Sequence, residues 1–194
     1  MPRLACAVVL AGGESRRFGS DKALARFRGE PLVARVLRTL REAGFAQLAI
    51  VAKEPDKYAA LAGDATLLTD VRPNQTPLAG LAAALRASTF PLVFACAADM
   101  PFAADPSLID ALAAAIEGHD AAVPRAAGSL QPLCALWRRD PCLKVAEQLL
   151  DAPRPPGPRA ILPLVRAAHL DWADNRPFLD ADTPDVLREL ELRP

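Results

Sequence analysis

Short apolar segments alternate with helix-like segments along the first part of the chain. Continuous apolar runs are typical of strands that are buried on both faces of a sheet. Apolar side chains at helical spacing, such as Leu32, Val36 and Leu40, instead predict a helix with one buried face. These patterns predict strands at Leu4–Leu10, Gln47–Ala52, Ala65–Thr69 and Leu92–Ala97, and helices at Pro31–Ala43, Pro77–Ala87 and Pro106–Ile116.

The rest of the chain is less regular. The predicted strands there are Ala121–Val123, Leu133–Trp137 and His169–Trp172, and the predicted helices are Leu143–Leu150, Ile161–Ala167 and Pro184–Leu192. We interpret the Pro-rich stretch 152–158 as a surface loop within one domain. Strands that alternate with helices imply an α/β fold, with a mostly parallel sheet and helices on both faces. The length of 194 residues suits one domain, so we expect a single domain over residues 1–194.

Charge and cysteine content exclude several classes of protein. Basic and acidic residues are equal at 23 each, whereas binding to nucleic acid or to a membrane surface favours a basic excess. No apolar run approaches the roughly 20 residues of a transmembrane helix. The four cysteines, Cys6, Cys96, Cys134 and Cys142, lack the paired spacing of a zinc site or a disulfide framework. We therefore expect a cytoplasmic protein without nucleic-acid or membrane partners.

The strongest chemical signal is the segment Leu-Ala-Gly-Gly-Glu-Ser-Arg-Arg-Phe-Gly-Ser-Asp-Lys-Ala at residues 10–23. It follows the first predicted strand, at the carboxyl edge where open α/β sheets bind ligands. Its glycines let the backbone approach a phosphate closely, and Arg16, Arg17 and Lys22 supply the charge that a triphosphate needs. The glycine spacing matches neither the dinucleotide fingerprint nor the Walker loop. The alternative interpretation is a flexible turn with solvated basic residues.

This segment resembles the signature of the molybdenum cofactor guanylyltransferase family, within the wider sugar-nucleotide pyrophosphorylase-like nucleotidyltransferases. The resemblance continues, in the family's order, along almost the whole chain. It implies a three-layer, Rossmann-like nucleotidyltransferase fold. It also implies that the nucleotide is bound by the motif residues Leu10, Ala11, Gly12, Gly13 and Lys22.

Further nucleotide contacts are implied by the third strand and the helix after it. Asp70 ends that strand, and the Pro-Leu-Ala-Gly segment at 77–80 is similar to one that encloses the nucleotide in the family. The resemblance therefore assigns Asp70, Leu78 and Gly80 to the nucleotide. Alternatively, the segment is only a helix start, with Thr76 as the N-cap and Pro77 in the first helical position.

Asp99 is the second strong element. A strand of core residues ends in this carboxylate, and Pro101 prevents the strand from continuing. A carboxylate at this edge suits Mg²⁺, which proteins bind through one or two carboxylates together with substrate phosphates. The family places its metal-binding Asp here, so the resemblance assigns Asp99 to nucleotide and metal. The alternative is a turn-forming Asp before a proline.

Acceptor binding is implied for three later residues. Gln131 stands where many relatives have His, and because an amide does not titrate near neutral pH we assign it to binding and not to proton transfer. Asp180 and Asp182 alternate along the chain, so their side chains should share one side of an extended segment. Either of them could complete the Mg²⁺ shell opposite Asp99. Alternatively, Asp182 or Thr183 only caps the last helix.

The resemblance implies an Mg²⁺-dependent transfer of GMP from GTP to the terminal phosphate of molybdopterin, which releases pyrophosphate and forms molybdopterin guanine dinucleotide. Arg17, Lys22 and Asp99 are then the catalytic candidates, whereas Arg16 should point away from the site. Molybdoenzymes or their chaperones are the further partners that it suggests. Gly12 favours GTP, because related cytidylyltransferases tend to carry Ala there. The alternatives are CTP as donor, another phosphate acceptor, or a non-catalytic nucleotide-sensing module.

Overall fold

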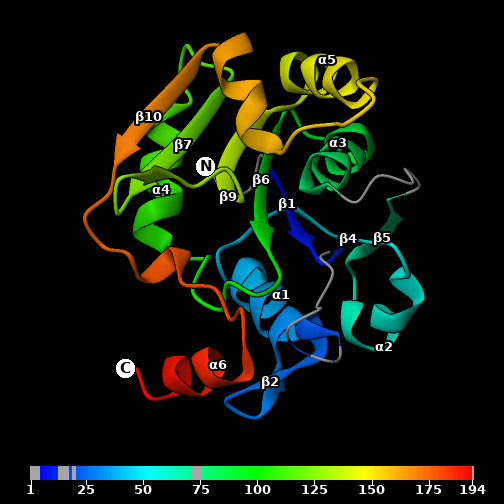
Figure 1. The fold of residues 1–194 in the computed structure, drawn as a ribbon, viewed down its shortest axis with the longest axis vertical. Helices are drawn as coiled ribbons and strands as arrows, with labels where there is room; N and C mark the ends of the chain where they lie inside the picture. The colour runs from blue at the N-terminus through cyan, green and yellow to red at the C-terminus, as the bar shows by residue number, and fades with distance from the viewer. Residues whose placement is uncertain (1–4, 13–17, 19–20, 71–75, 194) are drawn as a thin grey trace.

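The computed structural model describes residues 5–12, 18, 21–70 and 76–193. One mixed sheet with strand order β10-β7-β9-β6-β1-β4-β5 forms the centre, and β8 pairs with β7 (Figure 1). Its strands are β1 (Ala5–Leu10), β4 (Gln47–Ala52), β5 (Thr66–Thr69), β6 (Leu92–Ala97), β7 (Ala121–Ala126), β8 (Ser129–Leu130), β9 (Cys134–Arg138) and β10 (Ala167–Asp171). The α-helices are α1 (Leu32–Glu42), α2 (Ala59–Ala62), α3 (Pro77–Ala87), α4 (Pro106–Ala115), α5 (Arg139–Leu150) and α6 (Pro184–Glu191). The 3₁₀-helices are η2 (Lys22–Leu24), η3 (Pro55–Tyr58), η4 (Pro158–Leu164) and η5 (Arg176–Phe178).

Strand β1 occupies the point at which the direction of the sheet order reverses. It is parallel to both of its neighbours, β4 and β6. From β1 the chain moves outward through β4 to β5, and then returns to β6 on the other side of β1. The carboxyl ends of β1, β4 and β6 therefore share one edge, and ligands of open α/β sheets bind at such a reversal.

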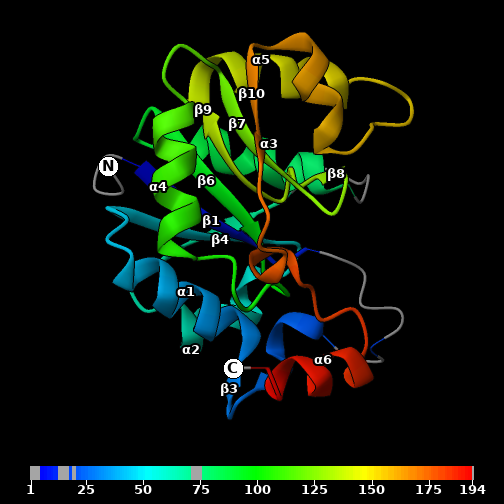
Figure 2. The same cartoon turned by 90° about the vertical axis from the view of Figure 1, so that its left-hand side faces the viewer.

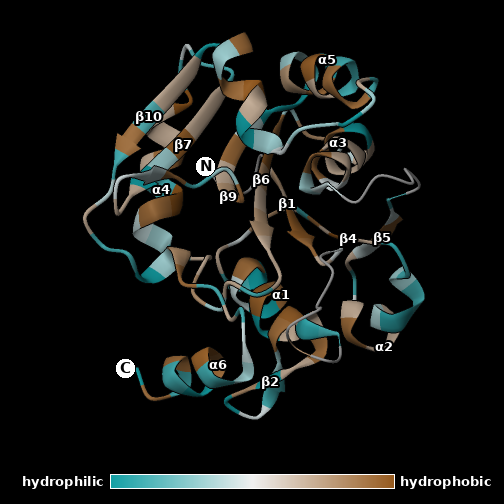
Figure 3. Cartoon of the chain, viewed as in Figure 1, coloured by the Kyte–Doolittle hydropathy of each residue, from teal (hydrophilic) through white to brown (hydrophobic). Residues whose placement is uncertain are grey.

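Helices cover both faces of the sheet, because successive residues of a buried strand point to opposite faces. On one face, Ala7 and Val9 of β1 belong to a core that includes α1 and α4. On the other face, Cys6 and Val8 belong to a core with α3 and α5. Figure 2 shows the two helical layers, and in Figure 3 the central strands are mostly apolar whereas the helices carry both apolar and hydrophilic residues. The predicted three-layer α/β fold is confirmed. None of the helices in the described residues has the length and apolar character that a membrane span requires.

The second half of the sheet contains a reversed strand. β9 is antiparallel to both β6 and β7, whereas the edge strand β10 is parallel to β7. Because β9 is reversed, the residues that precede it reach the carboxyl edge of β6. There the Ala97 N–H donates a hydrogen bond to the Leu133 carbonyl at 3.1 Å.

A smaller apolar cluster lies beyond that edge and joins two segments that are far apart in the sequence. The hairpin of β2 (Arg26–Phe27) and β3 (Glu30–Pro31) packs against α6 (Figure 2). The Arg28 N–H donates to Glu191 Oε1 at 2.6 Å across this contact. The buried residues of the cluster are Phe27, Leu32, Ala181, Leu187 and Leu190.

The predicted elements of the first part are confirmed to within one or two residues, but parts of the second half were predicted wrongly. The predicted helix Ile161–Ala167 is wrong: the segment forms η4, and β10 already begins at Ala167. Pro163 has no N–H to donate, which disfavours an α-helix there. The helix predicted from Leu143 begins at Arg139, because Pro141 is tolerated in a first turn. The hairpin β2–β3, η3 and α2 were not predicted.

Candidate active site

The candidate site lies at the sheet edge where β1 and β6 end. The Ala11 N–H donates to the Val51 carbonyl at 2.8 Å, and the Leu10 carbonyl accepts from the Ala98 N–H at 3.0 Å. These bonds hold the start of the glycine-rich motif between β4 and β6. Gly12 is exposed, and a Cβ added to it would meet nothing within 4 Å. The backbone is therefore open to a ligand at this point.

Asp99 follows β6 and has a side chain that is only 16% exposed. Its Oδ2 is in an ion pair with the Lys22 ammonium. Its Oδ1 is buried and has no hydrogen-bond partner among the described residues. A buried oxygen without a partner is unfavourable, so this atom is suited to accept a cation or a donor group from a ligand.

Lys22 connects Asp99 to the C-terminal part of the chain. It begins η2, and its Nζ lies 2.9 Å from Asp182 Oδ1. Burial disfavours the charged form of Lys22, but the interactions with Asp99 and Asp182 outweigh burial and raise the pKa of its ammonium. Lys22 is therefore a charged group that bridges two carboxylates at the edge of the sheet.

Asp180 and Asp182 lie on one side of the extended segment before α6, with Ala181 buried between them. The Ala181 N–H donates to the Asp99 main-chain carbonyl at 2.9 Å, which ties this segment to the end of β6. Burial raises the pKa of the Asp180 carboxyl, as do the charges of Asp182 and Asp99, whereas Lys22 lowers it. The cap of α6 is Thr183, whose hydroxyl accepts from the Val186 N–H at 3.2 Å, so Asp182 is not needed for capping.

These residues fit a divalent cation in the way that Mg²⁺ is usually bound. Oxygen donors are its preferred ligands, and the partnerless Oδ1 of Asp99 is such a donor. The negative charges of Asp182 and Asp99 raise the pKa of the Asp180 carboxyl, and a bound cation would relieve this repulsion. In the described part of the chain, no three His, Cys, Asp or Glu side chains are grouped closely enough to hold a metal ion by themselves.

The other nucleotide candidates lie on the side of β4, β5 and α3. Asp70 follows β5, and its N–H donates to the Ala52 carbonyl at 3.0 Å. Leu78 is fully buried in the core under α3, so only its backbone could reach a ligand. Gly80 packs closely on β1, because an added Cβ would lie 3.3 Å from Leu10 Cδ2. The N-cap of α3 is Thr76, whose hydroxyl accepts from the Leu78 N–H at 3.3 Å.

Gln131 lies at the same edge but on the far side of β6. Its N–H donates to the Pro124 carbonyl at 2.9 Å, and its side-chain amide donates to the Ser129 carbonyl at 3.4 Å. Among the described residues, no hydrogen bond joins it to Lys22, Asp99 or Asp182. The structure thus brings together Lys22, Asp99, Asp180 and Asp182. The predicted residues Gly13, Arg16 and Arg17 lie outside the described residues.

Asp21 and Tyr58 contribute to the site and were not predicted. Asp21 is the N-cap of η2, and its Oδ1 accepts from the Ala23 N–H at 3.1 Å. The Tyr58 hydroxyl donates to Asp21 Oδ2 at 2.8 Å and lies 3.3 Å from the Ala11 carbonyl. Asp before Lys-Ala-Leu is a local capping signal, but no local pattern connects Tyr58 with Asp21.

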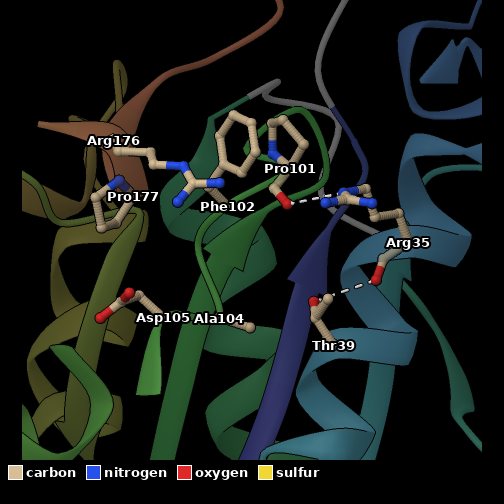
Figure 4. A pocket seen from close by; sticks show the side chains of 8 residues that line it. All are labelled: Arg35, Thr39, Pro101, Phe102, Ala104, Asp105, Arg176 and Pro177. Carbon is tan, nitrogen blue, oxygen red and sulfur yellow. Dashed lines mark hydrogen bonds between the residues drawn. The ribbon is translucent and has the colours of Figure 1, made fainter. Parts of the chain in front are cut away.

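A separate cavity of about 170 Å³ lies between α1 and the loop after β6 (Figure 4). Arg35 donates from Nε to the Pro101 carbonyl at 3.2 Å, and its guanidinium lies 4.9 Å from the centre of the Phe27 ring. The Arg176 guanidinium stacks on Phe102 at 4.6 Å. None of the predicted site residues that the structure describes lines this cavity. Its arginines instead brace the loop that carries Asp99.

Comparison with known proteins agrees with this geometry. The model of the MobA-like NTP transferase domain matches residues 7–170. A protein of Natronomonas pharaonis, named a probable molybdenum cofactor guanylyltransferase, is 33% identical over 199 residues, with 96% of each chain covered. A molybdenum cofactor guanylyltransferase of Desulfosudis oleivorans is 36% identical over 145 residues, which cover 74% of this chain and 69% of that protein. The crystal structure of molybdopterin-guanine dinucleotide biosynthesis protein A from Archaeoglobus fulgidus has the same fold, with a TM-score of 0.77, 24% identity and 96% of both chains covered.

A glycine-rich motif at the reversal point of the sheet, with a lysine and carboxylates beside it, defines a nucleotidyltransferase. The chain belongs to the family of MobA-like NTP transferases. The enzyme class and the family resemblance predicted from the sequence are therefore confirmed.

Proposed function

We propose that this enzyme acts in molybdenum cofactor biosynthesis and transfers GMP from GTP to the terminal phosphate of molybdopterin. The main support for the proposal is that Lys22 of the glycine-rich motif pairs with Asp99 and Asp182 at the edge of the sheet. The names of the relatives from Natronomonas pharaonis and Desulfosudis oleivorans support guanine as the base and the molybdenum cofactor as the acceptor.

The reaction needs alignment and charge neutralisation more than proton transfer. An oxygen of the acceptor phosphate attacks the α-phosphorus of GTP and forms a new P–O bond. The bond from the α-phosphorus to the bridging oxygen breaks, and pyrophosphate leaves with that electron pair. Because the attacking phosphate is already an anion, no strong general base is required. Lys22 and Arg17 would bind the phosphates, and the backbone of Leu10, Ala11, Gly12 and Gly13 would hold the nucleotide.

Asp99 would hold a Mg²⁺ ion together with the nucleotide phosphates and with Asp180 or Asp182. When bound, the ion supplies positive charge to the triphosphate and to the leaving pyrophosphate. Asp70 and the start of α3 would close the nucleotide side of the site. Gln131, Asp180 and Asp182 would face the acceptor.

The proposal covers the chain as one nucleotidyltransferase domain over residues 1–194. We place the reaction in the cytoplasm, with molybdoenzymes or their chaperones as recipients of the product.

The test is incubation with purified molybdopterin and each of GTP, CTP, ATP and UTP, with Mg²⁺ or with EDTA. Mass spectrometry identifies the product, and a coupled assay measures pyrophosphate. We expect the guanine dinucleotide with GTP and Mg²⁺, no product with EDTA, and strongly reduced product from Asp99→Ala. A cytosine dinucleotide would instead identify CTP as the donor. Transfer only to another phosphate acceptor would exclude molybdopterin, and nucleotide binding without pyrophosphate release would support the sensing alternative.

A further inference from the structure

Tyr58 contacts both ends of the glycine-rich motif. Its side chain comes from η3, after β4, and the residue is only 2% exposed. The hydroxyl lies 2.8 Å from Asp21 Oδ2 and 3.3 Å from the Ala11 carbonyl. Ala11 precedes Gly12 and Asp21 precedes Lys22, so one phenol contacts the chain near the start and near the end of the motif.

Asp21 connects Tyr58 to the turn that contains Lys22. With Oδ2 occupied by Tyr58, Asp21 uses Oδ1 to accept from the Ala23 N–H at 3.1 Å, and its carbonyl accepts from the Leu24 N–H at 3.1 Å. These bonds fix the 3₁₀ turn in which Lys22 is the first residue. The direction of the Lys22 side chain toward Asp99 and Asp182 depends on that turn.

We propose that Tyr58 and Asp21 are positioning residues, which orient Lys22 toward the triphosphate of the nucleotide. The inference rests on the proposed function, because it takes Lys22 as the phosphate-binding cation. Neither residue needs to touch the substrate. Their contribution is that the Lys22 turn and the end of β1 keep one relative position before the nucleotide arrives.

The surroundings of Tyr58 support a permanent hydrogen bond instead of a titrating group. Burial raises the pKa of the Tyr58 phenol, and the hydrogen bond to Asp21 and the charges of Asp21 and Glu54 raise it further. Lys57 is also close enough to interact with the Asp21 charge, and its Nζ pairs with Glu54 Oε1 at 2.7 Å. The phenol therefore remains a neutral donor to the Asp21 carboxylate.

A double-mutant cycle between Tyr58 and Lys22 tests whether Tyr58 acts through Lys22. Tyr58→Phe keeps the ring and removes one hydrogen bond to a carboxylate, so in the wild-type background kcat/KM for GTP should fall about tenfold. The KM for molybdopterin should stay within about twofold. In the Lys22→Ala background, the same Tyr58→Phe change should alter kcat/KM by less than about twofold.

Ser88→Ala is the matched control. Ser88 is also buried, at 4% exposure, and its hydroxyl exchanges hydrogen bonds with Phe90 near the start of β6, at the opposite edge of the sheet. It should lower the denaturation midpoint without changing either KM. If Tyr58→Phe causes the same loss in both Lys22 backgrounds, or raises both KM values equally, Tyr58 is only a structural residue and the proposal is wrong.

Direct binding separates this inference from the proposed function. For wild type, Tyr58→Phe, Lys22→Ala and the double variant, the Kd of a fluorescent GTP analogue is also measured. This measurement requires no acceptor and no turnover. Binding without transfer to molybdopterin overturns the proposed function, and the four Kd values still decide the role of Tyr58. A wild-type protein that binds no GTP overturns both the proposed function and the role of Tyr58.

Because Tyr58 is the only tyrosine in the chain, ¹³Cζ-tyrosine labelling gives a single NMR resonance. Asp21→Asn should shift the ionisation of the Tyr58 phenol to lower pH. An unchanged titration of Tyr58 would contradict the contact between Tyr58 and Asp21.

Discussion

The two halves of the sheet are built differently, although both contribute to one edge. From β5 to β6 all neighbouring strands are parallel, and β1, β4 and β6 end at the edge that carries the glycine-rich motif and Asp99. From β6 to β10 the reversed strand β9 intervenes, so a turn with Gln131 reaches that edge from the opposite direction. Under the proposed function, the parallel half would offer backbone groups and charges to the triphosphate. The mixed half, together with the segment before α6, would border the site with side chains that select the acceptor.

This difference predicts that substitutions in the two halves will have separable effects. Changes at the ends of β1 and β6 should alter nucleotide use and the rate of the chemical step. Changes in the turn before β9 should alter acceptor use alone. The residue that links the halves is Lys22, whose ammonium pairs with Asp99 on one side and with Asp182 on the other.

The largest effect is expected for Asp99→Ala. It removes the carboxylate that pairs with Lys22 and would hold Mg²⁺, so kcat/KM should fall about a hundred- to a thousand-fold, as for the loss of one preorganised electrostatic group. The fold should persist, because Asp99 Oδ1 has no hydrogen-bond partner among the described residues. Pyrophosphate release and circular dichroism are the measurements. Asp110→Asn, an exposed carboxylate on α4, is the control, and wild-type turnover by Asp99→Ala would rule out the metal assignment.

A smaller loss is expected for Lys22→Ala. A hydrogen bond to a charged group contributes roughly 1.5–3 kcal/mol, so kcat/KM for GTP should fall about ten- to a hundred-fold. Steady-state kinetics at saturating acceptor would measure it, with the exposed Lys144→Ala on α5 as control. If Lys22→Ala and Lys144→Ala lower kcat/KM for GTP equally, Lys22 does not bind the phosphates.

Gly12→Ala tests base choice within the parallel half. We predict that the wild-type enzyme prefers GTP to CTP at least about tenfold, which corresponds to about 1.4 kcal/mol of differential binding. The added methyl group has room in the protein itself, since nothing lies within 4 Å of it, so the variant should fold. It should, however, narrow the space for the base of the nucleotide and reduce the preference for GTP over CTP. Specificity constants for both nucleotides measure this, and a wild-type preference for CTP would reverse the assignment.

Gln131→Ala tests the mixed half. The loss of one neutral hydrogen bond to the acceptor, about 0.5–1.5 kcal/mol, should raise the KM for molybdopterin by about two- to tenfold. The KM for GTP should not change, because no hydrogen bond connects Gln131 to Lys22 or Asp99 in the described part of the chain. A shift of the GTP KM instead would show that the halves are not separable.

The smallest expected effect is on stability: Asp180→Asn should change the free energy of unfolding, by an amount that depends on pH. The pKa of Asp180 is raised in the folded protein, so ionisation of this carboxyl opposes folding. This cost to the free energy of folding is absent at a pH below 3.8, the ordinary pKa of an Asp carboxyl. It grows as the pH rises from there to the folded-state pKa, and it is complete above the folded-state pKa. Asn should therefore increase the free energy of unfolding at neutral pH by at most about a few tenths of a kcal/mol, since the carboxylate is only partly buried and is screened by solvent. Urea titrations at neutral and mildly acidic pH should show the gain shrinking on acidification, and a variant less stable than wild type at neutral pH would contradict this.

The contrast between halves also explains which parts of the fold were predictable. In the parallel half, buried strands appear as apolar runs, and helices such as Leu32–Glu42 carry an apolar face at regular spacing. In the mixed half, η4 contains Pro163, and β10 is a partly exposed edge strand without a continuous apolar run. The hairpin β2–β3 depends on its contact with α6, more than 150 residues later, which no local pattern records.

The amino-acid sequence alone was enough to predict the class of fold, the glycine-rich motif after the first strand, the carboxylate after β6 and the placement of Asp180 and Asp182 on one side. All of these depend on residues within a few positions of one another, through strand and helix periodicity and through turn chemistry. Three contacts arise only in the folded molecule: that of Lys22 with Asp182, 160 positions away, that of the Asp99 carbonyl with the Ala181 N–H, and that of Tyr58 with Ala11 and Asp21. Such contacts follow from how the sheet, the hairpin and α6 pack, because packing brings together side chains whose separation along the chain carries no periodic signal.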